Sequence, residues 1–199
     1  MASMIQVVDG AIDDDDRRAA NSEVLEDFDS VVRRHQQRIY RVLLGMVRDT
    51  GAAENLTQEC FLKAYQSRSS YRGEASVSTW LVRIAINLAH DYHRNRRAAF
   101  WRRLFAGDND GSEFAARLPS EAATPEQVLV AREKLAAVWL AAEKLSPQQR
   151  SVFVLRFVEQ MSLEEIAAAT DLKLGTVKAH LFRALGTVRK QMKEWQVSS

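Results

Sequence analysis

The sequence predicts an all-α fold with two small helical domains joined by a flexible acidic linker. Three observations predict it. Apolar residues recur every three or four positions, no segment alternates apolar and polar residues as a strand would, and a polar stretch rich in Gly and Pro divides the helical parts. At 199 residues, of which 46% are hydrophobic, the chain is long enough for one or two domains that each have a core.

The charges follow the same division. Residues 1–30 hold nine acidic residues and two arginines, whereas residues 31–103 hold fourteen basic and five acidic residues. Residues 104–126 hold five acidic residues and one base, and residues 127–199 hold eleven bases and seven acids. Two basic bodies separated by an acidic linker suit a polyanionic partner such as nucleic acid. The alternative for any single basic cluster is a solvated surface.

The first helical segment covers residues 28–46. Its apolar stripe consists of Phe28, Val31, Val32, His35, Ile39, Val42, Leu43 and Met46. We expect Gly51 to end this run. Cys60 lies on a further helical pattern with Leu56 and Ala64, which indicates a buried side chain rather than a nucleophile. A single cysteine excludes an intrachain disulfide and a cysteine cluster around a metal.

Residues 71–97, YRGEASVSTWLVRIAINLAHDYHRNRR, begin as a loop and continue as a helix. Gly73 and small polar residues favour the loop, and Thr79 is the expected N-cap. The expected buried stripe is Trp80, Leu81, Ile84, Ala85 and Leu88, and the opposite face carries Arg83, Asn87, His90, Arg94 and Arg97. Such a loop beside a basic helix can accept unstacked bases. The alternative is a core helix with a solvated basic face.

The sequence of the C-terminal part predicts four helices. One covers Val128 to Trp139, and Ser146, Pro147 and Gln149 mark the start of the next with a capping box. In residues 161–189, MSLEEIAAATDLKLGTVKAHLFRALGTVR, a second capping box of Ser162 and Glu165 begins a helix that ends near Thr170 and Asp171. A basic amphipathic helix follows, with the apolar stripe Leu174, Val177, Leu181 and Leu185. This layout predicts a four-helix helix-turn-helix domain, and the alternative is an ordinary amphipathic hairpin.

Other classes of function find little support. No apolar run reaches membrane-spanning length, and the acidic N-terminus lacks the features of a signal peptide, so we expect a soluble cytoplasmic protein. An enzyme would have to use His90, Asp91 and His93, but the two histidines supply only two metal ligands, with no His-Glu-x-x-His motif, phosphate loop or Gly-rich fingerprint. We therefore expect no catalytic residue, no metal, no cofactor and no small-molecule substrate.

Three segments together resemble the extracytoplasmic-function sigma factors, the minimal two-domain members of the sigma-seventy family. They are ENLTQECFLKAY (residues 54–65), YRGEASVSTWLVRIAINLAHDY (71–92) and SLEEIAAATDLKLGTVKAHLFRAL (162–185), and the whole resemblance covers residues 23–97 and 126–195. It implies binding to core RNA polymerase and promoter DNA, promoter melting, and control by an anti-sigma factor. It divides the chain into a disordered acidic tail (1–22), an N-terminal domain for polymerase docking and the minus-ten element (23–100), a linker (101–125) and a C-terminal domain for the minus-thirty-five element (126–199).

The resemblance also places the functional residues. Polymerase binding falls on Leu56, Gln58, Glu59 and Phe61. Minus-ten binding falls on Tyr71, Arg72, Gly73, Glu74, Ala75, Ser76, Val77, Ser78, Trp80, Arg83 and Asn87. Minus-thirty-five binding falls on Lys173, Thr176, Lys178, Ala179, His180, Phe182 and Arg183. The chain departs from the family at Asn55, usually an acid, at Val77, often an aromatic, at Lys173, often Pro or Ser, and at His180, often Arg.

A two-domain response-type regulator is the competing interpretation, because it shares the TVKAHL pattern of residues 176–181. It would bind DNA without melting it. Its receiver half, however, requires alternating strands and helices around an acidic pocket. Residues 23–97 show only helical periodicity, which favours the sigma-factor interpretation.

Overall fold

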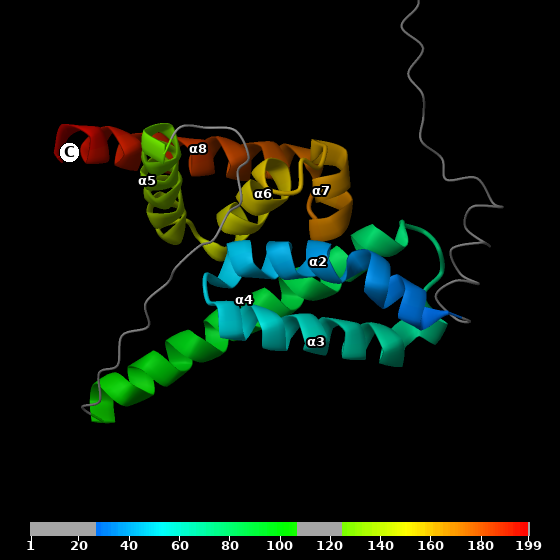
Figure 1. The fold of residues 1–199 in the computed structure, drawn as a ribbon. Coiled ribbons are helices and arrows are strands. Elements are labelled where there is room, and N and C mark those ends of the chain that lie inside the picture. The colour runs from blue at the N-terminus through cyan, green and yellow to red at the C-terminus, as the bar shows by residue number, and fades with distance from the viewer. Residues whose placement is uncertain (1–26, 107–124, 199) are drawn as a thin grey trace, which may run out of the picture.

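The computed structural model describes residues 27–106 and 125–198, all of whose regular structure is helical. Figure 1 shows two layers of helices, the first formed by α2–α4 and the second by α5–α8. Within these ranges there is no strand, as the periodicity predicted. The expected acidic tail (1–22) and most of the expected linker lie outside the described residues.

The N-terminal body consists of α2 (Phe28–Val47), α3 (Thr50–Ser67), the 3-10 turn η1 (Arg68–Ser70) and α4 (Val77–Ala106). Side chains of Asp27 and Asp49 cap the first two helices by accepting bonds from backbone N–H groups in the first turn. The prediction that Gly51 ends the first helix is wrong. Arg48 ends α2 in the left-handed conformation at φ 59°, and Gly51 lies inside α3 because Asp49 already starts the next helix.

The C-terminal body consists of α5 (Pro125–Glu143), α6 (Pro147–Phe157), α7 (Leu163–Thr170) and α8 (Leu174–Ser198), the four helices expected. Both predicted capping boxes are present. Ser146 and Gln149 exchange bonds at the start of α6, and Ser162 does the same with Glu165 at the start of α7. These caps fix the two helix starts within one residue of the prediction.

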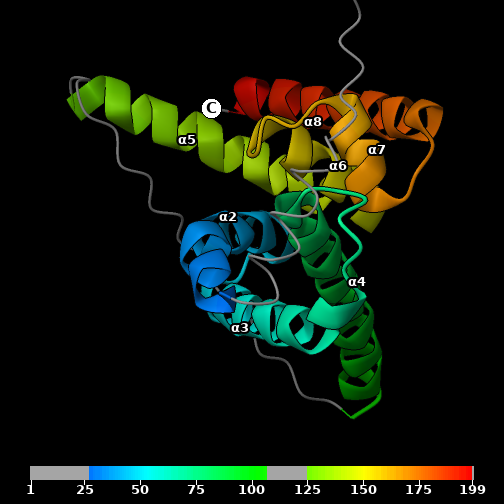
Figure 2. The ribbon, with the colours of Figure 1, turned by 90° about the vertical axis from the view of Figure 1, so that its right-hand side faces the viewer.

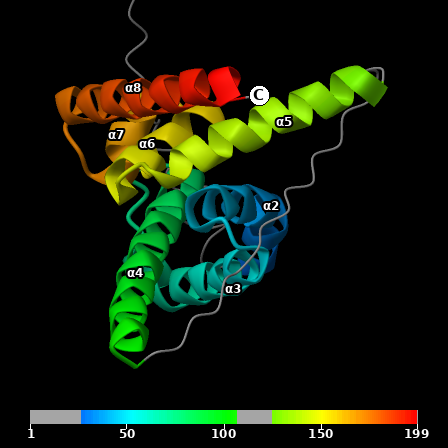
Figure 3. The ribbon, with the colours of Figure 1, turned by 90° about the vertical axis from the view of Figure 1, so that its left-hand side faces the viewer.

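The two bodies pack directly against each other. In Figures 1, 2 and 3, α6 and α7 lie between α8 and the N-terminal body, and α4 runs beneath them and extends away. The helix α4 continues through Ala106 and α5 starts at Pro125, so both ends of the segment expected as a linker are helical. The C-terminal body contacts α2 through α6, and it contacts α4 through α6 and α7.

The hydrophobic core differs from the expectation of one core per domain. The largest cluster contains apolar residues of α2, α3 and α4 together with residues of α6, α7 and α8. Fully buried members from the C-terminal body are Val152, Val154, Leu155, Ile166 and Val177. A smaller cluster of α5, α6 and α8 includes Ala141, Leu145, Phe153 and Ala184. Much of the apolar surface of α6 and α7 is therefore buried against the N-terminal body, which stabilises the joined arrangement.

Candidate nucleic-acid interface

The loop of residues 71–76 is shaped by two aromatic rings. The ring of Tyr71 packs on that of Trp80 with centroids 4.9 Å apart, and the Tyr71 hydroxyl donates a hydrogen bond to the carbonyl of Ala75 at 2.6 Å. Burial raises the pKa of Tyr71, which keeps this hydroxyl a donor. Gly73 adopts φ 69°, a conformation that glycine accepts without strain. The loop is thus held in one shape by its own side chains.

This loop forms one wall of a cavity of about 270 Å³ at the start of α4. The lining residues are Ser70, Tyr71, Arg72, Glu74, Ala75, Trp80 and Arg83. Sites for drug-sized ligands usually enclose about 300–1,000 Å³, so this cavity suits one small planar group better than a large metabolite. Two aromatic rings and two guanidinium groups at its edge match the chemistry that binds an unstacked base and its phosphate.

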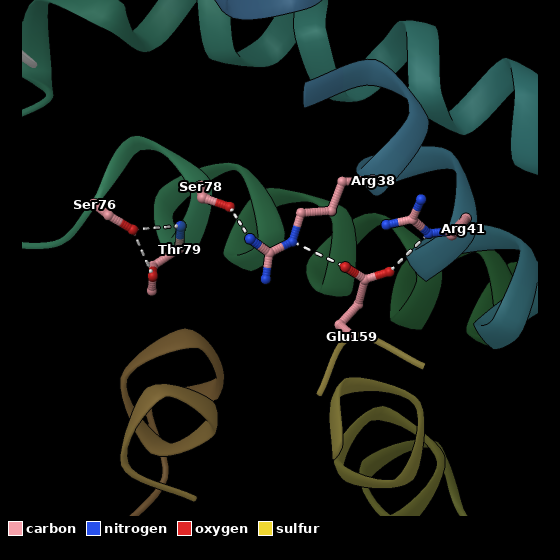
Figure 4. Close-up of polar contacts among 6 residues, drawn as sticks. All are labelled: Arg38, Arg41, Ser76, Ser78, Thr79 and Glu159. Carbon is pink, nitrogen blue, oxygen red and sulfur yellow. Dashed lines mark hydrogen bonds and ion pairs between the residues drawn. The ribbon is translucent and has the colours of Figure 1, made fainter. Parts of the chain in front are cut away.

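The N-cap of α4 lies three residues before the predicted one. Ser76, rather than Thr79, acts as the N-cap, because its Oγ accepts the bond from the Thr79 backbone N–H at 3.2 Å and also contacts the Thr79 hydroxyl at 2.9 Å (Figure 4). Val77 is buried in the core, so it is not available for stacking on a base. Ser78 accepts a hydrogen bond from Nη1 of Arg38 on α2 at 2.6 Å.

The face of α4 opposite the core carries Arg83 and Asn87, both exposed as predicted. Nη2 of Arg83 donates a hydrogen bond to the backbone carbonyl of Ala168 in α7 at 2.6 Å. His90, expected on the same basic face, is only partly exposed because its Nε2 lies 2.9 Å from Oγ of Ser151 on α6. The predicted DNA-facing side of α4 therefore meets the C-terminal body.

The helix-turn-helix is formed by α7 and α8. Asp171 ends α7 in the left-handed conformation at φ 56°, and the N–H of Leu172 bonds to the carbonyl of Ala167 at 3.2 Å. A further bond, from the N–H of Thr176 to the carbonyl of Lys173 at 2.8 Å, begins α8. This tight turn sets the angle at which α8 leaves α7.

Most predicted minus-thirty-five residues are exposed, on α8 or, for Lys173, directly before it. Lys173, Thr176, Lys178, Phe182 and Arg183 are exposed, whereas Ala179 and His180 are partly buried. Phe182 stands out with 78% of its surface exposed. The exposed residues put cationic and apolar groups on one helix, as contacts with phosphates and base edges require. Val177, Ala184 and Val188 supply the buried side of the helix.

The predicted polymerase-docking residues divide between surface and core. Gln58 and Glu59 are exposed on α3, and Oε1 of Glu59 lies 3.3 Å from Nζ of Lys63. Leu56 and Phe61 are buried in the core, with 8% of each residue exposed. The exposed apolar residues of this helix are Leu62 at 56% and Tyr65 at 47%, which periodicity alone had not singled out.

The side chains considered for an enzyme have structural partners. Nε2 of His93 lies 2.9 Å from the carbonyl of Met46, and His90 contacts Ser151. Asp91 pairs with Arg94 at 3.0 Å. Within residues 27–96 and 133–194 no three side chains of His, Cys, Asp or Glu converge as a metal site requires. The thiol of Cys60 is buried and donates toward the carbonyl of Leu81, and burial raises its pKa to about 12.

The described helices also bear on membrane association. None of them is both long enough and apolar enough to span a bilayer.

The fold is all-α and carries two candidate DNA-binding surfaces. One is the exposed basic helix of the helix-turn-helix, and the other is the aromatic cavity before α4.

Comparisons with known proteins identify the family. The sequence models of Sigma-70 region 2 and Sigma-70 region 4 match residues 31–99 and 135–188. The chain is 34% identical over 161 residues to the ECF RNA polymerase sigma-E factor of Escherichia coli, covering 79% of this chain and 82% of that one. It is 28% identical over 167 residues to the ECF RNA polymerase sigma factor SigW of Bacillus subtilis, covering 84% of this chain and 89% of the relative.

Solved structures agree on the fold. The chain superposes with a TM-score of 0.64 on CnrH, solved in complex with the cytosolic domain of CnrY, at 22% identity over 91% of this chain and 99% of that one. It superposes equally, with a TM-score of 0.64, on the sigma factor RpoE of Bartonella quintana at 21% identity, covering 84% and 98%. The chain belongs to the extracytoplasmic-function sigma factors of the sigma-70 family, which act in the initiation of transcription.

Proposed function

We propose that three surfaces of this sigma factor divide the work of initiation. The exposed face of α3 docks on core RNA polymerase, the loop of residues 71–76 with the start of α4 reads the minus-ten element, and α8 reads the minus-thirty-five element. The observation that carries the proposal is the cavity before α4, because it joins an aromatic pair to exposed Arg72 and Arg83. Catalysis belongs to the polymerase core in this scheme.

The docking surface is assigned to polar and apolar groups that lie together on α3. Gln58 and Leu62 are four residues apart, so they share one face of the helix, and Glu59 and Tyr65 flank them. Exposed carboxylates and amides suit an arginine-rich partner surface, since hydrogen bonds to a charged guanidinium are strong. Leu62 and Tyr65 would supply the apolar centre that a stable interface needs.

Promoter melting is assigned to the loop. A base that leaves the stack loses a few kcal/mol of stacking and pairing, and stacking on an aromatic side chain returns about 1–3 kcal/mol per base. The rings of Trp80 and Tyr71 line the cavity together with Arg72, which supports assigning base stacking to the two rings and a phosphate contact to the arginine. Asn87, one turn after Arg83, can bond a base edge or the backbone.

The second reader is α8 with Lys173, Thr176, Lys178, Phe182 and Arg183. Its exposed N-terminal turn favours phosphate contacts, and the lysine and arginine side chains can reach bases or phosphates in the major groove. We also propose that the protein works in the cytoplasm and is restrained by an anti-sigma factor. Support for such a partner comes from the RpoE structure of Bartonella quintana, which was solved with the anti-sigma factor NepR.

In-vitro transcription tests the proposal. Purified chain is added to core polymerase with a randomised promoter library, and initiated transcripts are sequenced. We expect transcripts that start downstream of a shared two-part motif and depend on the chain. A variant with Tyr71→Ala and Trp80→Ala should still assemble with core and bind duplex promoter DNA but lose open-complex formation. Transcription that is equal with and without the chain would refute the assignment.

A further inference from the structure

The first turn of α4 fixes one end of the loop of residues 71–76. The backbone N–H groups of Thr79 and Trp80 bond to Oγ and to the carbonyl of Ser76, at 3.2 and 3.0 Å respectively. Trp80 also packs its ring on that of Tyr71, at the other end of the loop. The stacked pair of rings therefore keeps its shape only while this first turn stays formed.

A helix terminus is the part of a helix with the fewest hydrogen bonds of its own. Its first four N–H groups have no acceptor further back in the helix, so the first turn opens more readily than the interior. In α4 the following turns are fixed by the fully buried residues Leu81 and Ala85. A contact from another helix to the first turn therefore adds order where α4 itself supplies least.

Arg38 of α2 makes such a contact. Its Nη1 donates a hydrogen bond to Oγ of Ser78, in the first turn of α4, at 2.6 Å and across 40 residues of sequence. The next residue along α2, Ile39, is buried in the core that α2 shares with α4. The bond thus joins a fixed point of one helix to the helix end that needs support.

The guanidinium of Arg38 is itself held in orientation. Its Nε lies 2.9 Å from Oε2 of Glu159, which follows α6, and Oε1 of that carboxylate lies 3.2 Å from Nε of Arg41. Figure 4 shows the carboxylate between the two guanidinium groups. Because a guanidinium is planar and carries its donors in fixed directions, an anion on Nε restricts where Nη1 can point. The carboxylate of Glu159 therefore helps to aim Arg38 at Ser78.

The bond also bears on the role of Ser78. The family resemblance places Ser78 among the minus-ten residues, yet its hydroxyl is partly buried and already accepts a hydrogen bond from Arg38. The exposed charged groups on the cavity are those of Arg72, Glu74 and Arg83. These three side chains can meet DNA without breaking the contact between α2 and α4.

We propose that Arg38 is a positioning residue for base capture and acts through Ser78. The bond keeps the first turn of α4, and with it the rings of Tyr71 and Trp80, in the shape that accepts an unstacked base. Without the bond the rings remain, but the turn must be ordered again each time DNA binds, which weakens binding. This inference rests on the proposed function, since it needs the loop to bind bases.

The first measurement follows the turn in the free full-length chain, without DNA. Amide hydrogen exchange read by nuclear magnetic resonance reports how often the N–H groups of Thr79 and Trp80 lose their bonds to Ser76. Ser78→Ala removes the acceptor, and Arg38→Met keeps a long unbranched side chain without donors. Each variant should raise the two exchange rates about tenfold, because a hydrogen bond to a charged group is among the stronger ones.

Two matched variants remove the same kinds of group elsewhere. Ser69→Ala removes an exposed hydroxyl of η1, and Arg41→Met removes the arginine that shares Glu159 with Arg38. Both should leave the two exchange rates at the values of the unaltered chain. Combining Arg38→Met with Ser78→Ala should add nothing to either single change, because both remove the same bond.

The second measurement uses holoenzyme assembled from core polymerase and each full-length variant. The probe is a fluorescein-labelled single strand that carries the minus-ten segment found by the transcription experiment. Arg38→Met and Ser78→Ala should bind it about tenfold more weakly than their controls, and the double variant should match the single ones. Assembly with core and affinity for minus-thirty-five duplex DNA should stay at the control values, whereas general destabilisation of the N-terminal body would lower assembly as well.

Three results would overturn the positioning role. They are exchange equal to that of the controls, faster exchange with unchanged affinity for the single strand, and weaker binding by only one of the two variants. The last result would make Ser78 or Arg38 a direct DNA contact. The variant with Tyr71→Ala and Trp80→Ala separates these failures from failure of the proposed function. If it loses the single strand, the loop binds bases and only the role of Arg38 is rejected; if it binds normally, the proposed function itself fails.

Discussion

Gly45 of α2 lies so close to Val154 of α6 that a side-chain carbon at position 45 would come within 3.0 Å of Cγ1 of Val154. The same carbon would be 3.5 Å from the indole ring of Trp139 on α5. Contacts of 3.0 Å between carbon atoms are not tolerated without movement. The absence of a side chain at Gly45 therefore permits the close packing of the two bodies.

Replacing Gly45 by Gln should separate the bodies while preserving each of them. The substitution favours the helix, since glycine in a helix interior costs about 1 kcal/mol relative to alanine, yet its side chain has no room against α6. We expect a larger radius of gyration in small-angle scattering with unchanged helix content. Gly51→Gln, at an exposed position near the start of α3, is the matched control and should remain compact. Equal scattering from both variants would show that α6 adapts to a side chain at position 45.

Acid should open the same interface through two histidines. Burial lowers the pKa of His90, opposed by its contacts with the Pro147 backbone and Asp91. Burial also lowers the pKa of His93, opposed by the Met46 carbonyl, while the positive charges of Arg150 and Arg96 and the neighbouring His90 lower it further. Both histidines are therefore neutral while the two bodies are packed together. Each stabilises this packed arrangement above its ordinary pKa of 6.5.

That stability should be lost as the pH falls from about 6.5 through the lowered pKa values, because protonated imidazole is better solvated in the open form. Fluorophores attached at Ser69→Cys and Lys190→Cys, exposed positions in opposite bodies, report the distance between the bodies by energy transfer. This transfer should decrease at pH 5.5 relative to pH 7.5, about one unit below and one unit above the ordinary histidine pKa. The helix content measured by circular dichroism should stay the same. The variant with His90→Gln and His93→Gln keeps hydrogen-bonding capacity but cannot titrate, so its transfer should be flat over this range. A decrease of equal size in that variant would assign the effect to other groups.

Reversal of charge at Glu59 should prevent assembly with core polymerase. The side chain is 45% exposed and pairs with Lys63 across one helical turn, an interaction worth only about 0.3–0.5 kcal/mol, so Glu59→Lys should leave the fold intact. Co-purification with core enzyme is the measurement. Glu54→Lys makes the same change on α3 about 140° around the helix axis and should assemble normally. Loss of assembly in both variants, or in neither, would contradict the proposed docking face.

Removal of the Arg183 side chain should weaken binding to the minus-thirty-five element. The expected loss is about 1–3 kcal/mol if Arg183 reads a base, with relaxed preference at one position, and a smaller, sequence-uniform loss if it contacts phosphate. Affinity is measured on duplex promoter DNA selected by the transcription experiment. Arg189→Ala removes an exposed arginine from another side of α8 and serves as the control. The recognition-helix assignment fails if the two variants bind promoter DNA equally well.

Local features of the structure were predictable because they depend on neighbouring residues. The capping boxes of Ser146 with Gln149 and Ser162 with Glu165 operate within four residues, so each helix start could be predicted. Burial of Cys60 and exposure of Glu59 follow from helical periodicity. The end of α2 was missed because Arg48 takes a left-handed conformation that its residue type does not favour.

Periodicity was less informative where one face of a helix is apolar without being buried. Leu62 and Tyr65 fit an apolar pattern on α3, yet both remain exposed. Periodicity did place Leu56 on the buried pattern of Cys60, whereas the family resemblance placed Leu56 and Phe61 at the polymerase surface; both lie in the core. The pattern alone distinguishes polar from apolar faces, but not which apolar residues the rest of the fold covers.

The sequence by itself determined the helices, the two capping boxes, the two basic bodies and the resemblance to the family to which the chain belongs, because these properties reside in short segments and in composition. Only the tertiary structure decided which surfaces meet. Glu159 and Arg41 are 118 residues apart, and neither carries a local signal of the other. Their pairing depends on the balance between the cost of removing water from the carboxylate and its attraction to Arg38 and Arg41 when the two bodies come together. The free energy of this ion pair is a property of the assembled interface, and no single segment of the sequence contains it.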